Sequence, residues 1–165
     1  MCHVFGISAE LDYSSPTRLV VRDVELSDAS AKELSNARTD LLYAELKTEV
    51  AIDRVTSAAT PRTLERVPAG AVFQPSELVF SIYEKADYLR LKVVIDAMQL
   101  VEDDYLGGSG SRGSGKVRFR RLKVYARARG DYAEKVPFRT FATVQELAAA
   151  FSELESWLQK TVPTE

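Results

Sequence analysis

The chain has 165 residues, 45% of them hydrophobic and 28% charged, so it can bury one substantial core, and we predict a single domain over residues 1–165. No apolar run approaches the roughly 20 residues that span a bilayer, and the N-terminus lacks the pattern of a signal peptide, which predicts a cytoplasmic protein without a membrane partner. The single cysteine, Cys2, excludes an internal disulfide framework, and the single histidine, His3, excludes a metal site built from several histidines of this chain.

A formal net charge of −2 conceals a basic segment between Gly107 and Arg129. This segment holds eight lysine and arginine residues and no acidic residue. Such a block on a mildly acidic protein indicates a surface that faces a polyanion. A solvated strand face is the alternative interpretation of the same charges.

The first half of the chain has the pattern of strands. Residues 17–26 are rich in β-branched and apolar side chains and predict a strand, whereas residues 27–37 fit a short helix or a loop. Residues 45–53 alternate between apolar and charged side chains, which predicts a half-buried strand. The apolar side of this strand would carry Leu46, Thr48, Val50 and Ile52.

A segment without hydrophobic periodicity follows this strand. Residues 54–68 are small, polar and basic and contain two prolines, whereas residues 71–83 regain the character of a strand. We therefore predict a long hairpin that projects from a sheet, with a thumb-like arm over about residues 52–67.

Residues 87–104 are predicted to form an amphipathic helix, because apolar side chains recur there at helical spacing. These apolar side chains are Leu91, Val94, Met98 and Val101. The helix would end in an acidic run, Glu102 to Asp104, which opposes the helix dipole. We therefore expect a nearby cation or a loop rich in hydrogen-bond donors at this end.

The last third predicts a strand and a helix. Residues 116–127 have the composition of a strand, but the apolar face changes between Phe119 and Leu122, which predicts a bulge or break near Arg120 and Arg121. Residues 143–146 have the form of a capping box that opens a helix. Its apolar stripe would be formed by Val144, Leu147, Phe151, Leu154 and Leu158.

Strands outnumber helices in this order and are joined partly by hairpins. We therefore predict an α+β fold in which helices cover one side of a largely antiparallel sheet, in a ferredoxin-like or RNA-recognition-motif-like arrangement.

The segment from Gly107 to Lys116 is the most informative, because five glycines within nine residues let the backbone approach a ligand closely. It fits the G-x-x-x-x-G-K pattern of a nucleotide-binding P-loop and the G-x-G-x-x-G pattern of a dinucleotide site. However, Val117 stands where a P-loop needs Ser or Thr. The loop also follows a predicted helix and precedes a predicted strand, which reverses both contexts.

A flexible linker is another interpretation of this loop. Arg112 and Lys116 argue against it, because both lie among the glycines and a basic strand follows them. Exposed amides, small hydroxyls and two cations suit a run of phosphates. The candidate phosphate-binding residues of the glycine loop (residues 107–116) are Gly107, Gly108, Ser109, Gly110, Ser111, Arg112, Gly113 and Lys116.

The run MQLVEDDYLGGSGSRGSGKVRF, from Met98 to Phe119, closely resembles the signature of RAMP-superfamily backbone subunits of type III-A CRISPR (Csm) interference complexes. Earlier blocks agree in order and spacing, and the resemblance covers nearly everything from Cys2 to Phe119. These blocks are CHVFG at residues 2–6, PTRLVVRDVEL at residues 16–26 and TEVAIDRVTSAATPRTLERVPAG at residues 48–70.

The resemblance implies an antiviral-defence protein that binds a guide RNA (crRNA) and its target RNA. It also implies assembly with further copies of itself and with other subunits of a type III complex. The glycine loop would lie against the guide backbone, and the arm matching Ile52 to Val67 would interrupt the guide–target duplex as a thumb. The candidate RNA-binding residues of the arm are Arg54, Arg62 and Arg66.

Members of this family begin with a strand, a loop bearing an aspartate for metal-dependent cleavage of target RNA, and a basic helix that grips the guide. All three precede the block that matches CHVFG, so we expect this chain to be the C-terminal part of a family member. The catalytic residue is therefore unassigned, and no cofactor is expected in this chain. Mg²⁺ or Mn²⁺ would serve the intact endoribonuclease.

The acidic residues of this chain have other expected roles. Asp53 would hold an arginine such as Arg54 or Arg66 at the base of the arm, and Asp103 and Asp104 would pair with Arg112. In several family members a zinc site ends in a cysteine at the position of Cys2. Because a lone cysteine cannot close a tetrahedral site, a buried or terminal thiol is the simpler interpretation of Cys2.

Three functions are compatible with these patterns. The first is a guide-RNA-binding subunit whose intact form cleaves target RNA, and the second is a non-catalytic RNA-binding scaffold. The third is a nucleotide-hydrolysing enzyme that uses the glycine loop. The sequence upstream in the gene separates the first two, and a nucleotide-binding assay tests the third.

Overall fold

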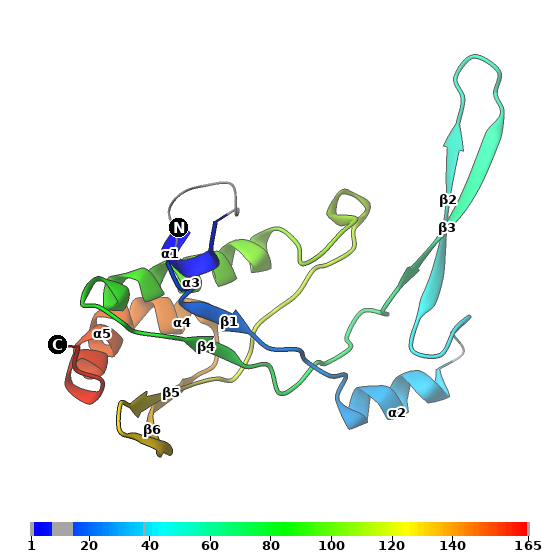
Figure 1. Ribbon diagram of the computed structural model, residues 1–165. Helices are drawn as coiled ribbons and strands as arrows, with labels where there is room; N and C mark the ends of the chain where they lie inside the picture. Colours follow the sequence, from blue (N-terminus) through cyan, green and yellow to red (C-terminus); the bar gives the residue numbers. More distant parts are fainter. Residues whose placement is uncertain (1, 8–14, 38, 165) are drawn as a thin grey trace. The chain divides into compact units, whose positions relative to one another are not determined.

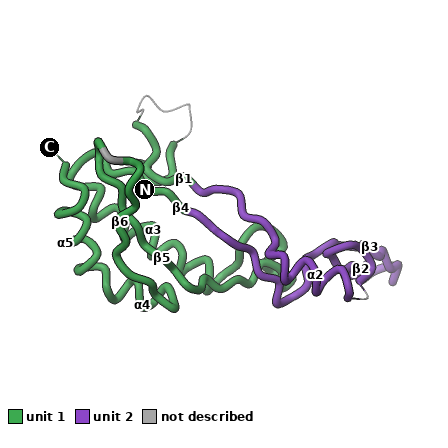
Figure 2. The backbone as a smooth tube through the Cα atoms, turned by 90° about the horizontal axis from the view of Figure 1, so that it is seen from below, with its two compact units in different colours: residues 1–20, 78–165 green, residues 21–77 purple. Residues whose placement is uncertain are grey.

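The computed structural model describes residues 2–7, 15–37 and 39–164. Its chain forms two compact units, unit 1 (Met1–Val20 and Leu78–Glu165) and unit 2 (Val21–Glu77), which Figure 2 distinguishes by colour. In the described part of the chain, the strands form three two-stranded sheets, β1–β4, β2–β3 and β5–β6. Helices accompany these sheets (Figure 1), so the predicted α+β class is confirmed.

Most of the elements belong to unit 1. In chain order they are α1 (Cys2–Phe5), β1 (Leu19–Val21, which ends at the unit boundary), β4 (Leu78–Phe80), α3 (Ala86–Asp103), a 3₁₀ turn (Gly110–Arg112), β5 (Leu122–Ala128), β6 (Asp131–Phe141), α4 (Val144–Ala149) and α5 (Phe151–Thr161). Unit 2 contains α2 (Asp28–Asn36), β2 (Glu45–Ile52) and β3 (Ala59–Arg66).

The core of unit 1 lies where α3, α4 and α5 meet β5 and β6. The predicted helix over residues 87–104 is confirmed as α3, and its apolar stripe faces the core, with Val94 and Met98 buried. The predicted C-terminal stripe is buried in full, although the helix is divided at Ala150 into α4 and α5. Apolar periodicity therefore identified the core-facing side of every long helix of this unit.

The predicted capping box is also present. Thr143 Oγ1 accepts a hydrogen bond from the N–H of Glu146 at 3.2 Å. The carboxylate of Glu146 accepts in return from the N–H of Ala142, one residue before the cap, at 2.8 Å. These bonds satisfy donors that the first turn of a helix leaves free, which fixes the start of α4.

Three strand predictions need correction. Over residues 17–26 only Leu19–Val21 form a strand, and over residues 71–83 only Leu78–Phe80 do. Residues 116–127 form a strand only from Leu122, because the backbone breaks at Arg121, which has a φ of +56°. The predicted break near Arg120 and Arg121 is therefore confirmed, whereas β6 was not predicted.

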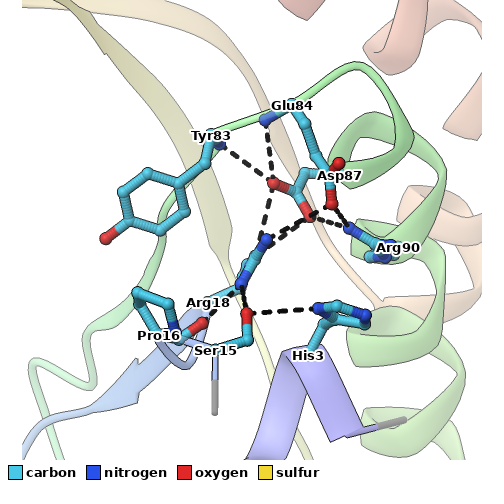
Figure 3. Close-up of polar contacts among 8 residues, drawn as sticks. All are labelled: His3, Ser15, Pro16, Arg18, Tyr83, Glu84, Asp87 and Arg90. Carbon is cyan, nitrogen blue, oxygen red and sulfur yellow. Dashed lines mark hydrogen bonds and ion pairs between the residues drawn. The ribbon is translucent and has the colours of Figure 1, made fainter. Parts of the chain in front are cut away.

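A buried ion pair fastens the segment before β1 to the start of α3 (Figure 3). Asp87 is fully buried and Arg18 is 5% exposed, with Nε and Oδ1 3.1 Å apart. The Asp87 carboxylate also accepts from the N–H groups of Tyr83 and Glu84, at 2.9 and 3.1 Å, and from Arg90 at 2.7 Å. Burial by itself raises the pKa of Asp87, but the hydrogen bonds from Arg90, the two N–H groups and Arg18 outweigh it and hold this pKa below its ordinary value.

Unit 2 contains a long antiparallel hairpin, in which β2 and β3 pair from Glu45 with Arg66 to Ile52 with Ala59. The prediction that the apolar side of β2 is buried is wrong, because Val50 and Ile52 are 54% and 66% exposed. The opposite side is the half-buried one. It is covered by cross-strand ion pairs, which join Arg62 to Glu49 at 3.0 Å and Arg66 to Glu45 at 2.5 Å.

Asp53 lies at the tip of this hairpin rather than at its base. Its Oδ1 accepts hydrogen bonds from the N–H groups of Val55 and Thr56, each at 2.8 Å. The bonds from the backbone of Thr56 and Val55 lower the pKa of Asp53. The residue therefore closes the turn between the strands instead of holding an arginine, because short Asp side chains bond readily to the backbone two or three residues ahead.

Candidate nucleic-acid interface

The glycine loop begins directly after α3. Its ends are held together by the N–H of Leu106, which donates to the carbonyl of Gly115 at 2.8 Å. Between them the chain forms the 3₁₀ turn, which is flanked by Ser109 and Gly113 in the left-handed conformation. The residues from Gly107 to Arg112 are exposed or half-buried. The loop is thus a closed, structured turn with its backbone near the surface.

Two glycines are required by close packing within this loop. A Cβ atom on Gly110 would lie 2.0 Å from the ring of Tyr105, and one on Gly115 would lie 2.4 Å from the carbonyl oxygen of Leu106. Gly115 also has a φ of +85°. No larger residue fits either position without moving its neighbour.

Lys116 joins the end of the loop to the end of α3. Its ammonium group donates to the carbonyl oxygens of Glu102 and Asp103, at 2.6 and 3.1 Å. These carbonyls belong to the last turn of the helix, where the dipole favours a cation. The expected cation at this helix end is therefore Lys116, while the third N–H of its ammonium group is not used by these two bonds.

Glu102 fixes the residues that follow the loop. It is 2% exposed, and its Oε1 accepts a hydrogen bond from the N–H of Phe119 at 2.7 Å. Its Oε2 lies 3.5 Å from the guanidinium of Arg118. A buried carboxylate at the helix end thereby fixes the chain that leaves the loop toward β5.

The loop borders a cavity of about 380 Å³. Backbone and small side chains form most of its wall, together with one ring, one carboxylate and one ammonium group. The lining residues are Asp104, Tyr105, Gly110, Ser111, Gly113, Ser114 and Lys116. Hydroxyl, N–H and ammonium donors around an open cavity suit a phosphate group, and they carry no information about base identity.

The structure agrees with the argument against a P-loop. In a P-loop the glycine turn leads from a strand into a helix, whose N-terminal amides face the phosphate. Here the loop leaves the C-terminus of α3, and the residues after it are extended until β5 begins at Leu122. No helix N-terminus follows the loop within the described residues 113–121.

The candidate residues of the arm lie in unit 2, on the β2–β3 hairpin. Arg54 is exposed in the turn at its tip, next to Asp53. Arg62 and Arg66 lie on β3, where both are ion-paired across the hairpin. The structure therefore groups the loop residues within one unit and the arm residues within the other.

Sequence reasoning missed two side chains that shape the loop. Tyr105 packs against Gly110, and Glu102 accepts the N–H of Phe119. An aromatic residue two positions before a glycine tract was the available signal for the first. The second depends on how the loop closes, and no local pattern indicates it.

Among the residues that the structure describes, no group of three or more His, Cys, Asp or Glu side chains could hold a metal ion. Cys2 is an exposed free thiol. No helix in the described part of the chain has the length and apolar character to cross a membrane.

Comparison with known proteins adds a family to this geometry. A model described as "RAMP superfamily" matches residues 1–118. The chain is 37% identical over 163 residues to the "CRISPR system Cms endoribonuclease Csm3" of Methanocaldococcus jannaschii, covering 97% of this chain and 62% of that protein. Proteins of the same name from Methanothermobacter thermautotrophicus and Streptococcus thermophilus are 36% and 42% identical, and the matches cover 90% and 75% of this chain. They cover 64% and 56% of those relatives, so the chain spans about three fifths of their length.

Proposed function

The chain belongs to the RAMP superfamily, and on that premise we propose that it binds the guide RNA of a type III CRISPR complex as a backbone subunit. The observation that carries this proposal is the glycine loop, which presents hydrogen-bond donors and the ammonium group of Lys116 around an open cavity at the end of α3. The name of the related proteins, which places them in a CRISPR system, supports the same function.

The loop would contact the guide through its phosphates. Its hydroxyl groups and exposed amides would donate to phosphate oxygens, while Arg112 and the third N–H of Lys116 would supply charge. Such contacts position an RNA without selecting its sequence, because the phosphates are the same in every guide. A subunit that must accept many different guides needs binding of this kind.

The arm would contact the RNA through its arginines. Arg54 at the tip is exposed, so it can reach a phosphate without rearrangement. Arg62 and Arg66 would have to exchange Glu49 and Glu45 for phosphate oxygens, or contact RNA through their remaining donors. We therefore assign the first contact of the arm to Arg54.

Assembly and location follow from the same proposal. The chain would join further copies of itself and other subunits of a type III complex, bind target RNA through its guide, and act in the cytoplasm. Cleavage of that target with Mg²⁺ or Mn²⁺ would be an activity of the intact family member.

We propose that this chain by itself does not cleave RNA. Metal-assisted cleavage needs a carboxylate held beside the scissile phosphate. Asp53 is used by the hairpin turn, and Asp104 lines the loop cavity next to Lys116. The test is incubation of the purified chain with guide-complementary RNA and Mg²⁺ or Mn²⁺. Cleavage that disappears on Asp53→Ala or Asp104→Ala would contradict this assignment.

Binding of several unrelated RNA sequences at one salt concentration tests the main proposal. We expect affinities within a few-fold of one another, because phosphate contacts dominate. Saturable binding of ATP that RNA does not displace would instead favour the nucleotide-hydrolysing enzyme. A non-catalytic scaffold would bind RNA in the same way, and the cleavage assay on the intact protein separates it from the endoribonuclease.

A further inference from the structure

The β5–β6 hairpin has one face in the core and one face open. Side chains along a strand point alternately to opposite faces. The core-facing residues of β5 are Leu122, Val124 and Ala126, which lie in the core, where β5 contacts α5. The residues between them, Lys123, Tyr125 and Arg127, are exposed. We call these three residues, together with Lys135 of β6, the open face.

The open face is basic. Among the described residues, the side chains of Lys123 and Arg127 make no ion pair, and Lys135 Nζ lies 6.0 Å from the centre of the Tyr125 ring. Glu134 neighbours Lys135 on β6. Exposed cations such as Lys123 and Arg127, which pair with no carboxylate among the described residues, attract a polyanion.

The open face also presents an aromatic ring. Tyr125 is 48% exposed, between Lys123 and Arg127 on the same side of the strand. An exposed ring has a surface on which a base can stack, and the cations beside it can follow the phosphates on either side of that base. Sheets that bind single-stranded RNA combine these two features. An acidic protein is the alternative ligand for this face. It would pair with the cations, but its binding would not explain the exposed ring of Tyr125.

We propose that the open face is a second surface for single-stranded RNA, with Tyr125 stacked on a base and Lys123, Arg127 and Lys135 on the adjacent phosphates. This inference rests on the proposed function only because both take RNA as the ligand. The chain runs from Lys116 at the end of the glycine loop to Leu122 through exposed Arg118, Arg120 and Arg121. The basic segment therefore connects the loop to the open face within unit 1.

Photo-crosslinking of the full chain to a uridine homopolymer that carries 4-thiouridine tests this surface. Trypsin cuts after Lys123 and Arg127, which isolates Tyr125 in the peptide Val124–Arg127. We expect a crosslink in this peptide. Tyr125→Ala should weaken binding at least about fivefold, since stacking contributes roughly a factor of five or more per base, whereas Tyr125→Phe should bind almost normally. The fluorescence of Trp157 checks that each variant is folded.

Charge variants provide a second readout. Replacing Lys123 and Arg127 together with alanine should reduce the slope of log affinity against log salt by about 1.4 for single-stranded RNA. Lys160→Ala, an exposed cation on α5, is the matched control and should leave the slope unchanged.

The outcomes separate this inference from the proposed function. Crosslinks confined to residues 107–116, with Tyr125→Ala binding normally and Arg112→Ala weakened, would overturn the second surface and leave the loop proposal intact. Loss in Tyr125→Ala but not in Arg112→Ala would support the open face and count against the loop. Unchanged RNA binding with lost binding of a poly-glutamate peptide would assign the face to a protein, and no RNA binding by the unaltered chain would contradict both.

Discussion

The ammonium group of Lys116 donates to the carbonyl oxygen of Glu102 at 2.6 Å, so the cation that ends the glycine loop also caps the helix that precedes it. The two residues are 14 positions apart in sequence, and the intervening loop is held closed by this bond and by the Leu106–Gly115 backbone bond. A loop that is fixed at both ends loses less conformational freedom when it binds a ligand.

Glu102 is expected to fix the exit of the loop. Glu102→Ala should lower the free energy of unfolding by about 1–3 kcal/mol, because the half-buried N–H of Phe119 would lose its acceptor. Glu102→Gln keeps an oxygen for this bond and should cost less. Urea unfolding followed through Trp157 measures both changes. Asp103→Asn, at an exposed neighbour, is the control, and a control effect as large as that of Glu102→Ala would refute this role.

Tyr105 is expected to decide whether Gly110 can be replaced. In Gly110→Ala the new methyl group would overlap the ring of Tyr105, so the loop should shift and RNA affinity should fall. Tyr105→Ala removes the ring and therefore the overlap. When Gly110→Ala is added to Tyr105→Ala, it should reduce RNA affinity much less than it does in the unaltered chain. Gly108→Ala has open space around its methyl group and serves as the control. Equal losses in both glycine variants would show that flexibility, not packing, matters.

Acid should weaken unit 1 through Asp87. The folded pKa of this carboxyl lies below its unfolded value of about 3.9, so its contribution to stability is present above that value and is lost as the pH falls through the folded pKa. Asp87→Asn should lower the free energy of unfolding at neutral pH by about 3–5 kcal/mol, because Arg18 would stay buried without its buried charge partner and would keep only the exposed Glu84. Its stability should then vary less between pH 5 and pH 2. Urea midpoints measured from pH 5 to pH 2 test this expectation. An Asp87→Asn variant that loses stability with acid as steeply as the unaltered chain would contradict it.

The arm should exchange its amide protons faster than α3 in the free protein. Its turn from Asp53 to Ala58 is exposed, and the apolar side of β2 is exposed as well, so little buried surface opposes local opening. Hydrogen exchange followed by mass spectrometry compares residues 54–66 with residues 86–103. Protection of the arm equal to that of α3, without RNA or another subunit, would mean that the arm belongs to a stable core.

Helices were the part of the fold that the sequence predicted best. The stripes that include Met98 and Leu154 repeat at the helical period, which depends on neighbouring residues alone. Alternation in β2 gave the two faces correctly, but it could not show which face is covered, because that depends on Arg62 and Arg66 across the hairpin. The charged face is the covered one for this reason.

The candidate site was only partly predictable. Composition located the glycine loop, and the acidic end of α3 predicted a cation beside it. The identity of that cation as Lys116 depends on how the loop folds back on the helix. The open face around Tyr125 likewise depends on the helices α4 and α5 packing against its other side.

The salt dependence of RNA binding by Arg112→Ala tests the central claim most directly. Arg112 is preferred to Lys116 for this purpose, since removing Lys116 also uncaps α3. If the loop binds phosphates, the variant should weaken binding to unrelated RNA sequences by a similar factor, and the slope of log affinity against log salt should fall by about 0.7. Lys160→Ala should change neither quantity. An unchanged slope, or a loss confined to some sequences, would contradict the claim that this loop holds the RNA backbone.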